Sequence, residues 1–260
     1  MTQIITVTNQ KGGVGKTSIS SALISGLHQR GARVLGVDID PQGNLGFSFG
    51  LEIEEGPSVY DVLVGTHSIE EAIVQTPYGD ILHTDIMLSG IESEANFPRT
   101  GRETMLARHL GRVKNNYDFI IIDTPPSLNI LTINAYVAST GLIVPMEGEV
   151  LSLVGISQIQ DTIETVRKSF NPELKVLGIV MNKFSSRSVL NREILELAEQ
   201  VAEQLGSRVF PSKIRRGVDV AKAPAHGQSV LTYRPDSKPA MDLRKLVDAV
   251  AGDQFPRRKR

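Results

Sequence analysis

The chain has 260 residues and a mass of 28.3 kDa, which is enough for one large α/β domain. Hydrophobic residues make up 40% and charged residues 22%, a balance that excludes a disordered or fibrous chain. The sequence has no cysteine, which excludes disulfides, cysteine-ligated metal centres and thiol catalysis, and it has no apolar run long enough to cross a bilayer.

The net charge of −1 conceals an uneven distribution of charge along the chain. Residues 207–260 contain 13 Lys and Arg against 5 Asp and Glu, so the acidic excess lies in residues 1–206. A basic region of this kind indicates a surface that faces a polyanion. The alternative is that the region contains only solvated helix faces and a solubilising tail.

Apolar runs alternate with helical patterns from one end of the chain to the other. In chain order, the predicted strands are Ile4–Thr8, Val34–Asp38, Ile81–Met87, Phe119–Asp123, Leu142–Met146 and Val176–Met181. The predicted helices are Thr17–Arg30, Arg102–Asn115, Leu128–Ala138, Leu151–Ser169, Val189–Leu205 and Lys238–Ala251. This alternation predicts a three-layer α/β fold, in which a mostly parallel twisted sheet is flanked by helices on both faces.

No repeat or low-complexity linker interrupts the pattern, so we expect a single domain over residues 1–252. The stretch Phe49–Phe97 is the least regular and is expected to carry peripheral helices. Residues 253–260 end in Arg-Arg-Lys-Arg and are expected to form a mobile basic tail. The N-terminus has the pattern of a strand and not of a basic leader, so we expect a cytoplasmic protein.

The segment Gly-Gly-Val-Gly-Lys-Thr at residues 12–17, preceded by Lys11, lies between a predicted strand and a predicted helix. This is the context of a phosphate-binding loop. Glycines let backbone N–H groups surround phosphate oxygens, and the helix N-terminus adds its dipole. In such a loop Lys16 reaches the β- and γ-phosphates and the Thr17 hydroxyl ligates Mg²⁺. Gln10 stands where the usual pattern has its first glycine, so this loop is a deviant form.

Three segments together resemble the signature boxes of one family. Residues 11–17 resemble the deviant Walker A box of the ParA/MinD class of P-loop ATPases. Val37–Asn44 (VDIDPQGN) and Ile120–Pro126 (IIIDTPP) are similar to the second and third boxes of that class, and DPQGN is similar to the ParA-type partition ATPases. The resemblance implies the P-loop NTPase fold, ATP and Mg²⁺ as cofactors, and slow ATP hydrolysis.

The resemblance also implies a role for each matching residue. Lys11 resembles the signature lysine that reaches the partner's phosphates in a nucleotide-sandwich homodimer, where its charge would stabilise the transition state. Asp38 and Asp123 would hold Mg²⁺ directly or through water, although Asp38 could instead cap a turn. Asp40 would position or activate the attacking water.

These roles define three sets of expected site residues. The catalytic set is Lys11, Lys16 and Asp40, and the metal set is Thr17, Asp38 and Asp123. The nucleotide-binding set is Lys11, Gly12, Gly13, Val14, Gly15, Lys16, Thr17, Ser18, Asn182 and Pro211.

Asn182 ends a predicted strand in the segment Met181–Ser185 (MNKFS). GTPases use a similar Asn-Lys segment in which an Asp follows the Lys by two residues and accepts hydrogen bonds from guanine. Ser185 occupies that place and supplies no fixed anion, so we expect Asn182 to contact adenine. The alternative is that its amide satisfies local backbone groups.

The basic segment Phe210–Gly227 resembles a late region of the family in which arginines bind DNA without sequence preference. Arg216 matches the first of those arginines, whereas Asp219 stands where a second arginine is common. The expected DNA-binding residues are Lys213, Arg215, Arg216 and Lys222. The alternative is that Arg216 pairs with Asp219.

These observations predict an ATP-dependent switch that forms a homodimer, binds nonspecific DNA, and positions or segregates a plasmid, a chromosome or another cargo on the nucleoid. The expected partner is a ParB-like centromere- or cargo-binding adaptor that stimulates hydrolysis. One alternative is a membrane-cycling, MinD-like cell-division ATPase, although the final helix has the pattern of a core-packing helix and no membrane insertion is expected. Another is a metabolic enzyme on the same loop; its electron-carrier form requires cluster cysteines that the chain lacks.

Overall fold

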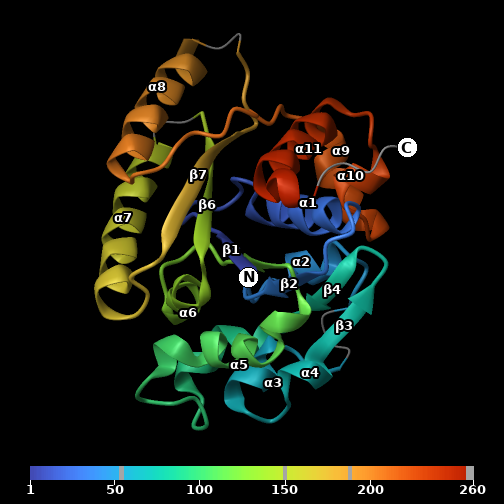
Figure 1. Cartoon of the computed structure of the whole chain (residues 1–260), viewed down its shortest axis with the longest axis vertical. Helices are drawn as coiled ribbons and strands as arrows, with labels where there is room; N and C mark the ends of the chain where they lie inside the picture. Colours follow the sequence, from blue (N-terminus) through green and yellow to red (C-terminus); the bar gives the residue numbers. More distant parts are fainter. Residues whose placement is uncertain (53–55, 149–150, 187–188, 256–260) are drawn as a thin grey trace.

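The computed structural model describes residues 1–52, 56–148, 151–186 and 189–255. The strands form one seven-stranded sheet in the order β3-β4-β2-β5-β1-β6-β7 (Figure 1). Neighbouring strands are parallel except for β3 and β4. The strands are β1 Gln3–Val7, β2 Val34–Asp38, β3 Ile73–Thr76, β4 Gly79–Leu82, β5 Phe119–Asp123, β6 Gly141–Glu147 and β7 Lys175–Asn182.

The central strands are buried on both faces because successive side chains point to opposite sides of the sheet. In β5, Ile120 and Ile122 pack into the core on one face, whereas Phe119 and Ile121 pack into the core on the other. All four side chains are buried. This double burial explains why the strand is a continuous apolar run instead of an alternating one.

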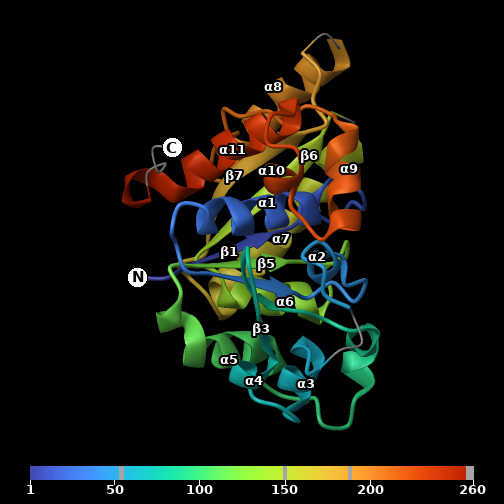
Figure 2. The same cartoon turned by 90° about the vertical axis from the view of Figure 1, so that its right-hand side faces the viewer.

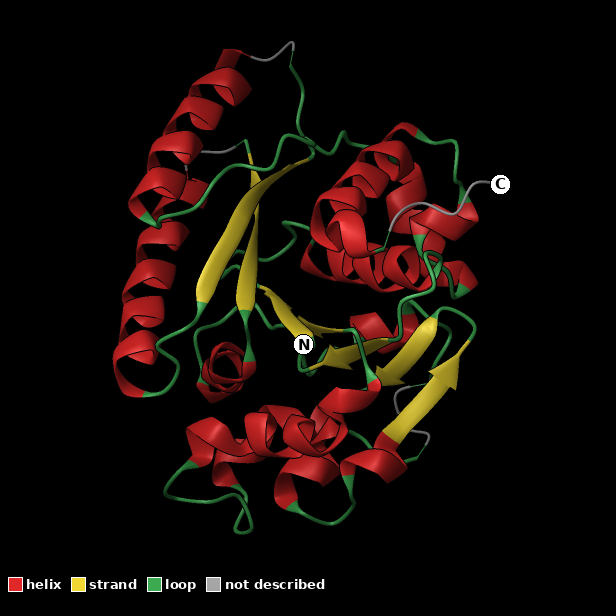
Figure 3. Cartoon of the chain, viewed as in Figure 1, coloured by secondary structure: helices red, strands yellow, loops and turns green. Residues whose placement is uncertain are grey.

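Helices cover both faces of the sheet and complete the three layers (Figures 2 and 3). One layer contains α1 Lys16–His28, α2 Asn44–Phe47, α9 Val218–Lys222, α10 Val230–Tyr233 and α11 Lys238–Ala251. The other contains α3 Val59–Val64, α4 Ile69–Ala72, α5 Met105–Val113, α6 Ile130–Ala138, α7 Leu151–Ser169 and α8 Val189–Gln204. Short 3-10 helices occupy Ile86–Ser93, Arg102–Thr104, Lys114–Asn116, Ala223–His226 and Gly252–Gln254. The predicted three-layer α/β fold is confirmed.

The region between β2 and β5 differs most from the sequence prediction. The predicted strand Ile81–Met87 is wrong beyond Leu82, because Asp85 starts a 3-10 helix by accepting a 2.7 Å hydrogen bond from the Met87 N–H group. The antiparallel edge strand β3 was not predicted. Its side chains are only partly buried, so its apolar signal is weak.

The predicted helix Arg102–Asn115 is shorter in the structure. Gly101 adopts a left-handed φ of 67°, and the next three residues form a 3-10 turn before α5 begins at Met105. A second 3-10 turn follows Val113. The helical pattern therefore identified the element but not its ends.

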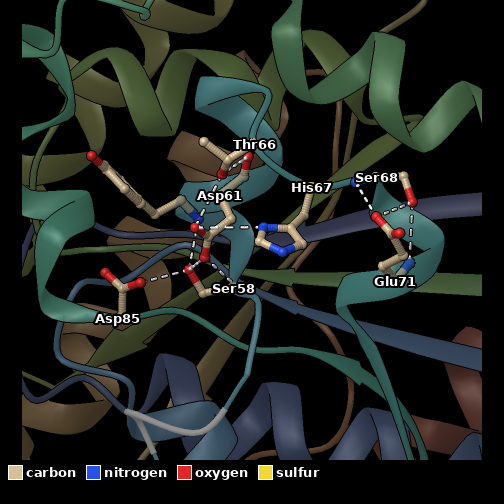
Figure 4. Close-up of polar contacts among 8 residues, drawn as sticks. Ser58, Asp61, Thr66, His67, Ser68, Glu71 and Asp85 are labelled. Atoms are coloured by element: carbon tan, nitrogen blue, oxygen red, sulfur yellow. Dashed lines mark hydrogen bonds and ion pairs between the residues drawn. The ribbon is translucent and has the colours of Figure 1, made fainter.

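Polar caps fix the short helices α3 and α4 (Figure 4). Ser58 and Asp61 form a capping box on α3, and Ser68 and Glu71 form a second one on α4. The Ser58 hydroxyl also donates a 2.7 Å hydrogen bond to Asp85, which ties α3 to the following 3-10 helix. These contacts satisfy amides that would otherwise lack partners at helix starts, so this polar cluster has a structural role.

Phe255, near the start of the expected basic tail, contacts the body of the protein. The Phe255 ring lies 5.5 Å from the Phe119 ring, measured between centroids, and its carbonyl accepts a 2.9 Å hydrogen bond from Arg30. Phe255 is thus held against the body of the protein, whereas Asp253 and Gln254 are exposed, and the mobility of the tail remains a prediction. The remaining tail, residues 256–260, lies outside the described residues.

Candidate functional site

The loop between β1 and α1 has the backbone shape of a phosphate-binding loop. Gly13 and Gly15 have φ values of 79° and 91°, in the left-handed region that favours glycine. A Cβ atom at Gly15 would also overlap the side-chain amide of Asn182, whereas a Cβ at Gly12 would meet nothing within 4 Å. The loop is therefore closed on its β7 side and open at Gly12.

Lys16 begins α1, and its side chain lies back over the loop. Its Nζ atom donates a 3.3 Å hydrogen bond to the Lys11 carbonyl, and the residue is only 6% exposed. Burial lowers the pKa of Lys16, although the charges of Asp123 and Asp40 oppose this shift. A polyphosphate would be a stronger partner for this ammonium than a carbonyl, so the arrangement suits an anion at the start of α1.

Two carboxylates meet at the carboxyl edge of the sheet. Asp38 ends β2, Asp123 ends β5, and the two residues are register partners. Asp123 accepts hydrogen bonds from Thr17 Oγ1 at 2.7 Å and from Ser20 Oγ at 2.8 Å. Burial raises the pKa of Asp123 to about 6. Burial first, and then the charge of Asp123, raises the pKa of Asp38 above its ordinary value.

These groups fit Mg²⁺. Buried carboxylates with raised pKa values are stabilised by a nearby cation. Among the described residues, no group of three or more His, Cys, Asp or Glu side chains could hold a metal alone. Mg²⁺ uses few protein ligands and takes the rest from water and phosphate oxygens, so Thr17, Asp38 and Asp123 would hold it beside a nucleotide. When bound, the cation would neutralise charge on the phosphates.

Asp38 also performs the capping role that the sequence left open. Its carboxylate accepts hydrogen bonds from the N–H groups of Asp40 at 3.1 Å, Leu45 at 2.9 Å and Gly46 at 3.2 Å. These bonds hold α2 and the loop that carries Asp40. Asp40 is buried, and its Oδ1 accepts from the Gln42 N–H group at 3.1 Å. One buried carboxylate thus positions the next.

Asn182 lies at the end of β7 and contacts the phosphate loop directly. Its Nδ2 donates to the Val14 carbonyl at 2.7 Å, and its Oδ1 accepts from the Lys183 N–H group at 2.9 Å. The amide therefore satisfies backbone groups, as the alternative interpretation stated. Contact with adenine remains a prediction.

A cavity of about 400 Å³ lies beside the loop. Pro211, which the resemblance placed at the nucleotide, is exposed and is not among the lining residues. Residues of the loop and of the late basic segment line the cavity together. They are Gly13, Gly15, Ser18, Asn182, Lys183, Arg215, Arg216, Gly217, Val218, Val220 and Ala221.

The late basic segment precedes and includes α9. Arg216 and Lys222 are exposed, and Lys213 is half-buried. Arg215 forms a two-pronged ion pair with Asp242 of α11, with N–O distances of 2.7 and 2.8 Å. Among the described residues, the arginine of this segment that forms an ion pair is Arg215, with Asp242, and the alternative pair of Arg216 with Asp219 is not found.

Sequence reasoning missed several side chains at this site. Ser20 lies one helical turn after Thr17, so the helix period could have identified it as a second hydroxyl facing the same carboxylate. Asn9 accepts from the Lys11 N–H group at 2.9 Å and donates to the Pro145 carbonyl at 2.6 Å. Glu147, at the end of β6, had no local signal because its contacts are distant in sequence.

Comparisons with known proteins place the chain in a family. A family profile described as an AAA domain matches residues 2–176. The sporulation initiation inhibitor protein Soj of Bacillus subtilis is 40% identical over 255 residues, which cover 96% of this chain and 99% of that protein. This chain belongs to the ParA/MinD class of P-loop ATPases. The chromosome partitioning protein ParA of Caulobacter vibrioides is 38% identical over 237 residues, covering 89% of this chain and 87% of that protein.

A solved relative of this ParA/MinD-class ATPase contains nucleotide and metal. The crystal structure of cobyrinic acid a,c-diamide synthase from Mycobacterium smegmatis with bound ADP and magnesium is 36% identical, with a TM-score of 0.82. The alignment covers 96% of this chain and 94% of that chain. That relative binds ADP and magnesium, and this chain belongs to the same class of ATPases, so the expected ATPase activity and the expected cofactors ATP and Mg²⁺ fit the family.

Proposed function

We propose that this ATPase is a dimerising switch that binds DNA nonspecifically and positions or segregates plasmid, chromosome or other cargo. The observation that carries the proposal is the shared wall of the 400 Å³ cavity. Gly13 and Gly15 of the phosphate loop and Arg215 and Arg216 of the basic segment line the same cavity. A nucleotide in this cavity would contact both segments, so its presence would act on the DNA-binding surface.

The proposed dimer forms around two nucleotides. Lys11 of each subunit would reach the partner's triphosphate, where a cation stabilises the charge of the transition state. Asp40 would position the attacking water, and its buried, hydrogen-bonded placement next to Asp38 supports a fixed orientation. A ParB-like centromere- or cargo-binding adaptor would stimulate hydrolysis and so release the dimer.

DNA would bind through Lys213, Arg216 and Lys222, with Arg215 held in place by Asp242. Contacts of this kind neutralise phosphates and release counterions, so affinity would fall steeply with salt, with a slope of about −0.9 per phosphate in log–log form. Such binding does not read bases, which suits a protein that uses the nucleoid as a track in the cytoplasm.

The experiment compares DNA binding in two nucleotide states. Fluorescence anisotropy of a labelled duplex is measured with Mg²⁺ and either ADP or a non-hydrolysed ATP analogue. The proposal expects much tighter binding with the analogue, and loss of that binding in an Arg216→Ala variant. Equal affinities in the two states would contradict the proposal.

The MinD-like alternative requires a lipid-binding surface near the C-terminus. The apolar face of α11 is buried, with Leu243, Leu246 and Val247 packed into the core that also contains α1. Among the described helices, none is both long and apolar enough to pass through a membrane. Co-sedimentation with anionic liposomes in the presence of the ATP analogue would support this alternative over DNA binding.

A further inference from the structure

The β7 end of the phosphate loop carries an ion pair that the roles above do not use. Lys183 directly follows β7, and its Nζ atom lies 2.7 Å from Oε1 of Glu147, the last residue of β6. The same Nζ donates a 2.8 Å hydrogen bond to the carbonyl of Gly13. One ammonium therefore joins the ends of two strands to the phosphate loop.

The backbone of Lys183 is held in an uncommon conformation. Among the described residues other than glycine, only Lys183 has a positive φ, which is 50°. A left-handed lysine is strained, and such strain persists only where the surroundings fix it. Asn182 supplies that constraint, because its side chain bonds both to the Lys183 N–H group and to the Val14 carbonyl.

The charges explain why a lysine is needed there. The Glu147 side chain is only 10% exposed, so its carboxylate is poorly solvated and lies close to the loop that accepts a polyphosphate. An uncompensated anion at this place would repel the nucleotide. The Lys183 ammonium neutralises it and at the same time fixes the Gly13 carbonyl.

We propose that Lys183 is a positioning residue for nucleotide binding, which neutralises Glu147 and holds the phosphate loop in its binding conformation. Lys183 acts through the loop and not on the γ-phosphate, so ADP and ATP benefit equally. This proposal rests on nucleotide binding alone and does not depend on DNA binding or on the dimer.

The test measures ADP binding by isothermal titration calorimetry with Mg²⁺ and without DNA. Lys183→Met should weaken ADP binding about tenfold, the order of magnitude expected for one uncompensated charge near the phosphates in a medium of intermediate dielectric. A non-hydrolysed ATP analogue should lose the same factor, and KM for ATP should rise more than kcat falls. Lys175→Met is the matched control, since Lys175 is an exposed lysine at the opposite end of β7 and should bind ADP as wild type does.

Two further variants separate charge from packing. The double variant Glu147→Gln with Lys183→Met removes both charges and should recover ADP affinity to within about threefold of wild type. Glu147→Gln alone should bind ADP at least as tightly as wild type, and it keeps the test valid if Lys183→Met does not fold. The proposal is overturned if Lys183→Met binds ADP normally, if the double variant binds as poorly as the single one, or if Glu147→Gln weakens binding.

Discussion

Burial of the Asp123 carboxylate lowers the stability of the nucleotide-free protein at neutral pH, and replacing Asp123 with Asn should remove that cost. Burial raises the pKa of Asp123 from 3.8 to about 6. The folded protein therefore binds this proton more tightly than the unfolded chain does. The stabilisation from that proton is complete below pH 4 and is lost as the pH rises through about 6.

The expected size follows from the shift in pKa. A rise of roughly two units at about 1.4 kcal/mol per unit corresponds to about 3 kcal/mol of stability lost by the wild type near pH 8. Asn at this position carries no charge, so Asp123→Asn should be more stable than wild type at pH 8 by up to about 3 kcal/mol. At pH 4 the difference should nearly disappear, because the wild-type carboxyl is then neutral.

The assay is urea unfolding of both proteins, free of nucleotide and metal, between pH 4 and pH 8. Asp118→Asn is the control, because the hydrogen bond from Arg33 lowers the pKa of Asp118 and its carboxylate therefore contributes nearly all of its stability already at pH 4. This variant should be less stable than wild type by a nearly constant amount between pH 4 and pH 8. Saturating Mg²⁺ and ADP should raise the free energy of unfolding of wild type more than that of Asp123→Asn. If Asp123→Asn were equally destabilised at pH 4 and pH 8, the buried charge of Asp123 would not limit the stability of the protein.

Two other substitutions test contacts around the site. Gly15→Ala should destabilise the protein by at least about 1–2 kcal/mol in thermal unfolding and abolish ADP binding, because alanine disfavours the left-handed φ and its Cβ would overlap the Asn182 amide. A Cβ at Gly12 meets no atom within 4 Å, so Gly12→Ala should be tolerated. Equal effects of the two variants would contradict this description of the loop. Arg215→Ala should lower the free energy of unfolding in urea by about 1–3 kcal/mol, because it leaves the buried Asp242 carboxylate without its ion partner. Arg216 is exposed, so Arg216→Ala should stay within about 0.5 kcal/mol of wild type. Equal stabilities of the two variants would show that the ion pair contributes little.

The sequence predicted the elements whose signal is local and strong. The strands Val34–Asp38 and Phe119–Asp123 have the predicted bounds, because strands buried on both faces are continuous apolar runs with sharp ends. The helix Lys238–Ala251 is also confirmed, with Ser237 as its N-cap and Gly252 at its end. The half-buried edge strand Ile73–Thr76 lacked such a signal and was missed.

The residues of the candidate site also fall into those with a local sequence signal and those without one. The glycines of the phosphate loop and the aspartates at two strand ends were found from sequence because each lies at a recognisable junction of strand and loop. The Glu147–Lys183 pair and the bond from Asn182 to the loop join segments that are far apart in sequence. No local pattern marks such contacts, since they depend on the order of strands in the sheet.

We propose that nucleotide joins two chains through Lys11, and light scattering of wild type and Lys11→Ala measures this dimerisation. With Mg²⁺ and a non-hydrolysed ATP analogue, wild type should have about twice the 28.3 kDa mass of the chain, and with ADP it should be a monomer. Lys11→Ala should bind ADP but remain a monomer with either nucleotide, because the partner's triphosphate would lack its neutralising charge. Dimers of Lys11→Ala that match those of wild type would rule out this role of Lys11.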